Sequence, residues 1–161
     1  MKTANSPDQV QIVDFDATKV AALEHRGDPL GIGSSIRKFI AWRRENRLPP
    51  RSSATFNVVY DDETAVMPQD FRFDLCAATN REVAGNRFGV VGKTIPGGRC
   101  AVLRHIGSDD TLRDTVRYLC TDWLPASGEE LRDFPLFFER VEFYPEVPER
   151  EAVTDVYLPL K

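Results

Sequence analysis

The sequence predicts an α+β domain built from two similar units, each with the order strand, helix, strand, strand. Three observations indicate this fold class. Short runs of alternating apolar residues indicate strands, and two segments place apolar residues at i, i+4, i+7 and i+8, the spacing of one helix face. The same series of strands and helix then recurs at an offset of about 80 residues.

The first predicted unit contains one helix among its strands. Strands are expected at QIVDF (11–15), KVAALEH (19–25), TFNVVY (55–60) and FRFDLCA (71–77). Asp28 is a typical N-cap and Pro29 a typical first helical residue. The apolar stripe of this helix consists of Ile32, Ile36, Phe39 and Ile40. The helix is expected to end near Asn46, because two prolines follow shortly after it.

The second predicted unit repeats this order. Strands are expected at RCAVLRH (99–105), LFFERVEFY (136–144) and TDVYLPL (154–160), and the helix stripe consists of Leu112, Val116, Leu119 and Cys120. Identical residues at the same offset are Ala21/Ala101, Leu23/Leu103, His25/His105, Gly27/Gly107 and Arg37/Arg117. Two amphipathic helices can resemble each other by chance. Here strand, turn glycine and helix stripe all keep one offset without a gap, which favours a duplication.

The predicted repeats cover about residues 10–78 and 98–160 of a single domain, residues 1–161, with a turn-rich linker at about 79–97. Within the linker, FGVV and KTIP predict one more strand that enters the second repeat. A unit of about 80 residues has a small hydrophobic core and is expected to be only marginally stable alone. Two such units would share a core and leave a cleft along their pseudo-twofold seam, where ligand clefts tend to form.

Composition excludes several classes of partner. The chain has 161 residues, a net charge of −4 and a pI near 5.3, which argues against a nucleic-acid binder but suits a cationic ligand. No apolar run approaches the roughly 18 residues of a membrane span, and the N-terminus lacks the hydrophobic segment of a signal peptide. Cys76, Cys100 and Cys120 lack CxxC spacing and are interpreted as reduced thiols of a cytoplasmic protein. We expect no metal and no cofactor.

The aromatic strand at 137–144 raises the main functional question. Alternation places Phe137, Glu139, Val141 and Phe143 on one face and Phe138, Arg140, Glu142 and Tyr144 on the other. The first face suits packing under the helices. In the first unit, Phe56, Val58 and Tyr60 share one strand face, and Phe71, Phe73 and Leu75 share a face of the next strand. If these faces line the cleft, it is aromatic and contains one carboxylate, Glu142.

Three interpretations of Glu142 remain open from the residues alone. A carboxylate in an aromatic cleft attracts a cation, and each ring face adds roughly 0.5–2 kcal/mol of cation–π attraction. The same group could act as a general base on bound water. It could also be a solvated sheet residue paired with Arg140 or Arg150, which spacing alone favours because charged side chains are mostly exposed.

The other conspicuous residues favour structural roles. His25 and His105 occupy equivalent places before the turn glycines Gly27 and Gly107, and no third metal ligand lies nearby in the sequence. A structural role at each strand-to-helix turn is therefore preferred to a catalytic or metal role. Tryptophans near helix ends, such as Trp123, more often form core or cleft wall than a specific site.

The whole run of motifs resembles a known family. From EHRGDP through TFNVVYDD, FRFDLCA, IPGGRCAVLRHIG and DWLPASGEELRDFPLFFERVEFY to TDVYLPL, roughly residues 10–160, the chain is similar to the GyrI-like family. This is the small-molecule-binding domain also found as the effector-binding half of AraC-type and MerR-type transcription regulators. The resemblance implies two strand–helix–strand–strand (SHS2) units around a pseudo-twofold cleft.

The resemblance also implies a ligand site. In that family a glutamate in an E-x-Y pattern near the C-terminus lies in the cleft and is associated with binding of cationic, lipophilic compounds. The pattern here is Glu142-Phe143-Tyr144. The ligand-binding residues implied are Glu142, Tyr144, Tyr60, Phe56, Val58, Phe71, Phe73 and Trp123.

The first functional hypothesis is a stand-alone binding module for cationic or aromatic lipophilic compounds, because the chain shows no helix-turn-helix segment. One alternative is a hydrolase of strained, cyclopropane-bearing electrophiles, with Glu142 as general base and Tyr60 or Tyr144 assisting. Another is a gyrase-inhibitor-like module with a protein partner. Neither nucleic acid nor membrane is expected as a partner, and the sequence makes no prediction of the oligomeric state.

Overall fold

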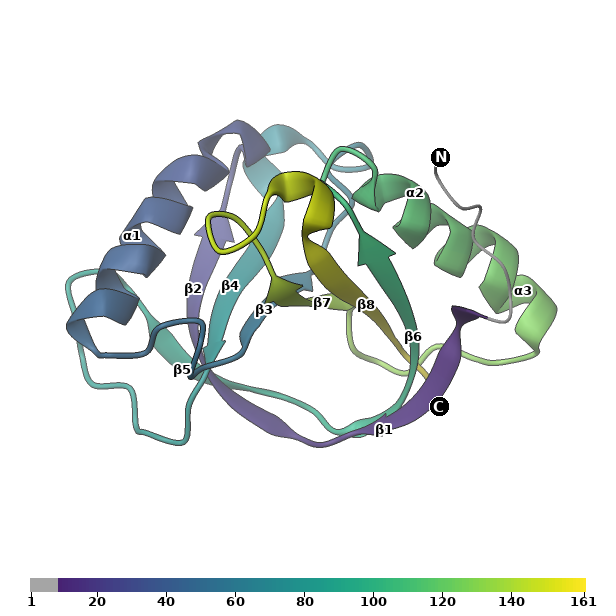
Figure 1. The fold of residues 1–161 in the computed structure, drawn as a ribbon, viewed down its shortest axis with the longest axis horizontal. Coiled ribbons are helices and arrows are strands. Elements are labelled where there is room, and N and C mark those ends of the chain that lie inside the picture. Colours follow the sequence, from purple (N-terminus) through teal and green to yellow (C-terminus); the bar gives the residue numbers. More distant parts are fainter. Residues whose placement is uncertain (1–8) are drawn as a thin grey trace. The chain divides into compact units, whose positions relative to one another are not determined.

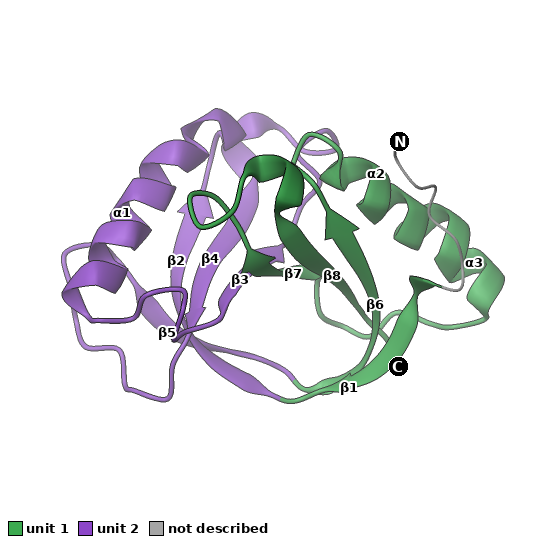
Figure 2. Ribbon diagram, in the orientation of Figure 1, with its two compact units in different colours: residues 1–16, 97–161 green, residues 17–96 purple. Residues whose placement is uncertain are grey.

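Two units, each with four antiparallel strands, make up the computed structural model, which describes residues 9–161 (Figure 1). Unit 1 holds residues 9–16 and 97–161 of the described chain, and unit 2 holds residues 17–96 (Figure 2). The strand order is β1-β6-β8-β7 in unit 1 and β3-β4-β2-β5 in unit 2. Each of these neighbouring strand pairs is antiparallel.

The elements follow one another in a simple order. Unit 2 contains β2 (Thr18–Arg26), η2 (Pro29–Gly31), α1 (Ile32–Glu45), β3 (Thr55–Val59), η3 (Pro68–Asp70), β4 (Arg72–Ala78) and β5 (Val91–Ile95). Unit 1 contains β1 (Gln11–Phe15), β6 (Gly98–Ile106), α2 (Leu112–Arg117), the π-helical segment η4 (Tyr118–Trp123), α3 (Leu124–Ser127), β7 (Phe137–Glu142), η5 (Glu149–Glu151) and β8 (Val153–Pro159). No helix among these residues is long and apolar enough to span a membrane.

The α+β class and the predicted strands are confirmed, but two strands pair differently from expectation. The extra strand β5 pairs with β2, in the register Val20↔Lys93, and does not enter the second repeat. The first strand, β1, pairs with β6, in the register Val13↔Cys100. The compact units therefore do not coincide with the predicted repeats. Their strand orders still match, since β3-β4-β2-β5 corresponds to β7-β8-β6-β1. The pseudo-twofold seam stays a prediction.

The core of unit 2 lies between α1 and one face of its strands. Phe39 and Trp42 of α1 are 5% and 4% exposed, and their rings stack with centroids 5.9 Å apart. They pack in one cluster with Ala21, Leu23, Leu48, Leu75, Ala77 and Val90. Removing either large ring would be expected to destabilise the fold by about 3–5 kcal/mol.

The buried face of α1 differs from the predicted stripe. Ile36 and Ile40 are 40% and 43% exposed, whereas Phe39, Trp42 and Arg43 are buried. Positions 39, 42 and 43 follow the i, i+3, i+4 spacing of one helix face, so the helix is rotated relative to the predicted stripe. In unit 1 the prediction fits better, because Leu112 and Leu119 are buried and Val116 and Cys120 are half-buried.

The two strand-to-helix turns have the same construction. His25 bonds Ser35 Oγ at 2.7 Å through Nδ1 and the Asp28 carbonyl oxygen at 3.0 Å through Nε2. His105 repeats this with Thr115 Oγ1 at 2.8 Å and the Ser108 carbonyl oxygen at 3.0 Å. A carbonyl only accepts, so in the neutral rings Nε2 donates and Nδ1 accepts from the hydroxyl. These contacts agree with the predicted structural role.

Each turn also needs its glycine. Gly27 and Gly107 have φ values of 116° and 131°, a region that residues with a Cβ rarely adopt. The amide of Gly27 donates to the Phe71 carbonyl oxygen, and that of Gly107 donates to the Ala152 carbonyl oxygen, both at 2.9 Å. The chain is thereby fixed at the start of each helix-containing connection.

A buried arginine organises the end of α1. The Arg43 side chain donates to the carbonyl oxygens of Leu48 and Ser53 and to Thr55 Oγ1, each at 2.7 Å. Burial lowers the pKa of Arg43 to about 10. The guanidinium thus joins the last turn of α1 to the loop that leads into β3, and it satisfies two carbonyl groups there.

We predict that Arg43→Met lowers the free energy of unfolding by about 2–4 kcal/mol, because the carbonyl groups of Leu48 and Ser53 lose their donor. Urea unfolding followed by circular dichroism measures this. Arg44→Met is the matched control, since Arg44 is the exposed neighbour in the same turn and its loss should change stability by less than about 0.5 kcal/mol. Equal stability of the two variants would contradict the role given to Arg43.

Candidate functional site

A β-bulge in β7 decides where Glu142 lies. Arg140 is opposite Thr154 and Glu142 is opposite Val153, so Val141 is the extra residue without a partner on β8. Residues directly opposite each other in an antiparallel pair project to the same face. Val153 shares a face with Asp155, which is opposite Glu139. The bulge therefore brings Glu142 onto the face of Glu139.

This face of unit 1 is the one that lies away from α2. Arg140, Thr154 and His105 occupy the opposite face by register. His105 bonds Thr115 of α2, and Arg140 bonds Asp109 just before that helix. The simple alternation that assigned Glu139 to the helix side and Arg140 to the cleft side is thus wrong. From Phe137 to Arg140 the two faces are the reverse of those predicted. After the bulge, Glu142 lies on the face away from α2, as the prediction of a cleft residue requires.

Three carboxylates gather on the face away from α2. Asp155 accepts two hydrogen bonds from Arg104, at 2.8 and 3.1 Å. Burial, together with the charge of Asp155, raises the pKa of Glu139, although a hydrogen bond with Tyr157 opposes the rise. Burial and the nearby Glu139 raise the pKa of Tyr157 to about 12. With Glu142, this group holds three carboxylates against one guanidinium, a net charge of −2 (1 − 3) when all are ionised.

Aromatic rings continue the same face. Phe137 stacks on Tyr157 with centroids 4.8 Å apart, and Phe15 meets the two rings edge-on at 5.0 and 5.3 Å. Phe137 and Tyr157 are opposite each other in the β7–β8 register, and Tyr157 alternates with Asp155 onto one face. We call the group Phe15, Arg104, Phe137, Glu139, Glu142, Asp155 and Tyr157 the acidic aromatic face of unit 1.

Glu142 is the unpaired acid of this face. Within residues 9–161 its side chain makes no hydrogen bond or ion pair, and the residue is exposed. Arg140, the partner that the sequence suggested, binds both carboxylate oxygens of Asp109 instead, at 2.7 and 3.2 Å. Glu142 thus shares a face with the rings of Phe137 and Tyr157, and without an ion-pair partner its carboxylate is free to meet a positively charged group from solution.

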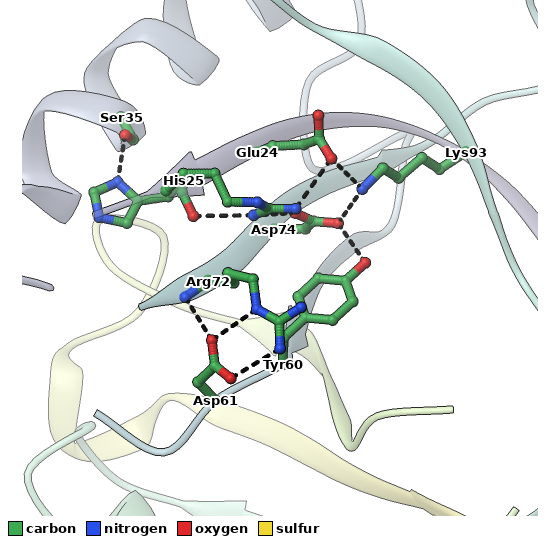
Figure 3. A network of polar contacts seen from close by, with 9 residues as sticks. Glu24, His25, Ser35, Tyr60, Asp61, Arg72, Asp74 and Lys93 are labelled. Carbon is green, nitrogen blue, oxygen red and sulfur yellow. Dashed lines mark hydrogen bonds and ion pairs between the residues drawn. The ribbon is translucent and has the colours of Figure 1, made fainter. Parts of the chain in front are cut away.

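Unit 2 carries a different polar group on the face of its strands away from α1 (Figure 3). The Asp74 side chain is fully buried and accepts from Arg26 at 3.0 Å, from Lys93 at 2.8 Å and from the Tyr60 hydroxyl at 2.8 Å. Glu24 bonds the same two cations from the exposed side, at 3.0 Å to Arg26 and 2.6 Å to Lys93. We call these five residues the Asp74 network.

The Tyr60 ring in this network is surrounded by the protein's own cations. Arg26, Arg72 and Lys93 lie 5.3, 5.4 and 5.7 Å from the ring centroid. Burial and the hydrogen bond to Asp74 raise the pKa of Tyr60. A ligand cation approaching this ring would meet like charges, although the sequence had placed Tyr60 among the residues for a cationic ligand.

Comparison with known proteins gives the family. The model of the GyrI-like small-molecule-binding domain matches residues 8–161. The chain belongs to the GyrI-like family. It is 42% identical to the "Probable transcriptional regulator YgiV" of Escherichia coli K12 over 152 residues, which are 94% of this chain and 95% of YgiV. No three His, Cys, Asp or Glu side chains of residues 9–161 form a group that could hold a metal ion.

Solved structures share the GyrI-like fold. The C-terminal domain of EcmrR superimposes with a TM-score of 0.76 at 16% identity, over 95% of this chain and 97% of that domain. In an EcmrR–DNA complex the TM-score is 0.75, and the match covers only 57% of the EcmrR chain. The protein SAV2435, solved bound to tetraphenylphosphonium, gives 0.62 at 7% identity, over 94% of this chain and 93% of that one.

The predicted ligand residues of the GyrI-like domain fall into different environments. Phe56 and Val58 are buried and share the face of Asp74, because Val58 is opposite Asp74 in the β3–β4 register. Phe73 packs against the core under α1, and Phe71 is buried with its ring 6.1 Å from that of Phe73. The expectation that both sets of rings line one surface is therefore wrong. Side chains alternate along β4, so Phe73 and Asp74 must point to opposite faces.

The remaining predicted residues lie in unit 1. Tyr144 follows β7 and is 68% exposed, and Trp123 is half-buried at the end of η4. Sequence reasoning missed Glu139, Asp155 and Tyr157 as members of one face, and Asp74 as the centre of a network. An aspartate in the middle of each of the strands RFDLCAA and VTDVYLP was the available signal, because a charged residue there must find partners.

We predict that Glu139→Gln removes a pH-dependent loss of stability. Because the pKa of Glu139 is raised in the fold above its ordinary value of 4.5, the folded state binds this proton more tightly than the unfolded state. The stabilisation is complete below the ordinary value and is lost as pH rises through the folded pKa. Urea unfolding across that range should show a steeper decline for wild type than for Glu139→Gln.

The side-chain amide that Glu139→Gln introduces can still accept the hydrogen bond from Tyr157, so packing is conserved in this variant. Glu146→Gln, an exposed acid in the loop after β7, is the control and should follow wild type. Parallel pH profiles for wild type and Glu139→Gln would show that the carboxyl group titrates as it does in the unfolded chain.

Proposed function

We propose that this GyrI-like domain binds lipophilic cations on the acidic aromatic face of unit 1, with Glu142 as the charged anchor. The observation that carries the proposal is the unpaired Glu142 carboxylate on the same face as Glu139, Asp155 and the ring of Tyr157. Charge attraction and ring faces act together on a cation that is also apolar. The domain's family and the likeness to YgiV support a ligand-sensing role in transcription control.

The chemistry of the face favours cations over anions or neutral molecules. Its carboxylates outnumber its guanidinium by three to one, and Arg104 is already bonded to Asp155. Binding a cation near Glu139 would also favour the ionised form of that carboxyl group, which burial disfavours. The fold neighbour SAV2435 was solved with tetraphenylphosphonium, which supports a delocalised aromatic cation as the first probe.

We predict that Glu142→Gln weakens tetraphenylphosphonium binding about five- to tenfold, which corresponds to the loss of one partly exposed charge contact of about 1 kcal/mol. Isothermal titration calorimetry measures the affinity. Triphenylphosphine oxide, a neutral molecule with three of the same rings, should bind both proteins equally. Size and packing are retained in this substitution, so the difference reports charge.

Glu146→Gln again serves as the control, because it removes one exposed carboxylate from the same unit without touching the acidic aromatic face. It should bind tetraphenylphosphonium like wild type. The proposal fails if Glu142→Gln binds the cation as tightly as wild type does, or if the neutral compound loses as much affinity as the cation.

A further inference from the structure

A pocket of unit 2 lies between the end of α1 and the segment 79–87. It has a volume of about 390 Å³, and all of its lining residues belong to unit 2. Trp42 and Leu48 of this lining are members of the core cluster under α1, so the pocket lies on the side of the strands opposite to the Asp74 network. Small-molecule pockets typically have about 300–1,000 Å³, so the volume suits a small organic ligand.

The inner wall of this pocket is apolar. Trp42 and Leu48 are 4% and 9% exposed, and the half-buried Val83 packs against the same core cluster. A ligand that reaches this wall therefore transfers apolar surface out of water, which favours a molecule with a hydrocarbon or aromatic body.

The indole N–H of Trp42 is an unused hydrogen-bond donor at this wall. Within the described chain Trp42 forms hydrogen bonds only through its backbone, whose carbonyl oxygen accepts from the side chain and the amide of Asn46 at 2.8 and 3.0 Å. No fully enclosed side-chain nitrogen or oxygen of the described residues lacks a partner, so solvent reaches the unpaired indole nitrogen. Since Trp42 is otherwise buried and borders the pocket, the N–H is accessible from the pocket.

Packing of the core does not require this donor. A buried tryptophan usually pairs its N–H with an acceptor of the protein, and a phenylalanine would fill much of the same space without a polar atom. The Trp42 ring already stacks on Phe39, yet its N–H has no acceptor within residues 9–161. An acceptor atom on a ligand would supply the missing partner.

The charged residues of the lining favour neither sign of ligand charge. They are two acids, Glu45 and Glu82, and two arginines, Arg81 and Arg87, so their charges sum to zero (2 − 2). Arg87 also binds both carboxylate oxygens of Glu45, which joins the end of α1 to the segment 79–87. The balanced charge and the apolar wall together favour a neutral ligand.

We infer that this pocket binds a small, flat, neutral compound that carries a hydrogen-bond acceptor, such as a ring nitrogen or a carbonyl oxygen. The acceptor takes the Trp42 indole N–H, and the apolar body of the ligand packs against Leu48 and Val83. The inference goes beyond the proposed function, because it concerns another unit and an uncharged ligand and does not depend on Glu142.

The test is a titration with quinoline at neutral pH, where its ring nitrogen is uncharged, followed by nuclear magnetic resonance. Naphthalene, with the same two fused rings and no acceptor, is the matched ligand. Trp42→Phe should weaken quinoline about fivefold, or about 1 kcal/mol, because it removes one hydrogen bond. Naphthalene should lose clearly less. Trp123→Phe makes the same change at the second of the two tryptophans of the chain and should bind quinoline like wild type.

Trp123→Phe also provides a measurement that does not depend on the folding of Trp42→Phe, because its single indole N–H signal belongs to Trp42. Quinoline should move this signal downfield, as a new hydrogen bond does, and naphthalene should not. An unmoved indole signal, no binding of quinoline to wild type, or equal losses for both compounds in Trp42→Phe would each overturn the inference. Failure of tetraphenylphosphonium to bind would instead count against the proposed function alone.

Discussion

The packing of a helix against one face of the strands in each unit is the constraint on which the rest depends. Side chains alternate along a strand, so burying Leu23, Leu75 and Ala77 under α1 directs Glu24 and Asp74 to the other face. In unit 1, Arg140 and His105 make their contacts on the α2 side of the strands. Alternation therefore directs Glu139 and Asp155 to the face away from α2. The faces away from the helices therefore carry the charged groups Glu24, Asp74, Glu139 and Asp155, since the covered faces are occupied by core packing and turn contacts.

On the faces away from the helices, the two mid-strand aspartates, Asp74 and Asp155, have different partners. Asp74 is fully buried and has three donors, two of them cationic, which offsets the cost of removing a carboxylate from water. Asp155 has one arginine, whose side chain is 57% exposed, and it lies opposite a second acid, Glu139. Unit 2 thus carries balanced charges, and unit 1 carries an excess of negative charge. This asymmetry is the reason for assigning a cationic ligand to unit 1 and not to unit 2.

Much of the fold could be predicted because it depends on local patterns. Alternation identified the strands, and Gly27 and Gly107 marked the turns before the helices. Asp28 and Pro29 were predicted to start the first helix, but Asp28 caps the 3-10 turn η2 and α1 begins only at Ile32. Which face of each strand is buried under a helix was harder to predict, because aromatic residues lie on both sides of these strands. Val58 of β3 and Phe73 of β4 lie on adjacent strands, and the sequence alone does not show that their side chains point to opposite faces. The register shows it, because Val58 is opposite Asp74 and not Phe73. The bulge at Val141 has no signal in the sequence, since an extra residue appears only when the partner strand is aligned.

The bulge carries Glu142 to the acidic aromatic face, where we propose that it binds a cation. A crystal structure of the domain with tetraphenylphosphonium tests it most directly. We predict that the phosphonium centre lies within about 6 Å of the Glu142 carboxylate and on the side of Glu139 and Tyr157. A phosphonium bound on the α2 side of β7, or in contact with Tyr60 in place of Arg26 and Lys93, would contradict it.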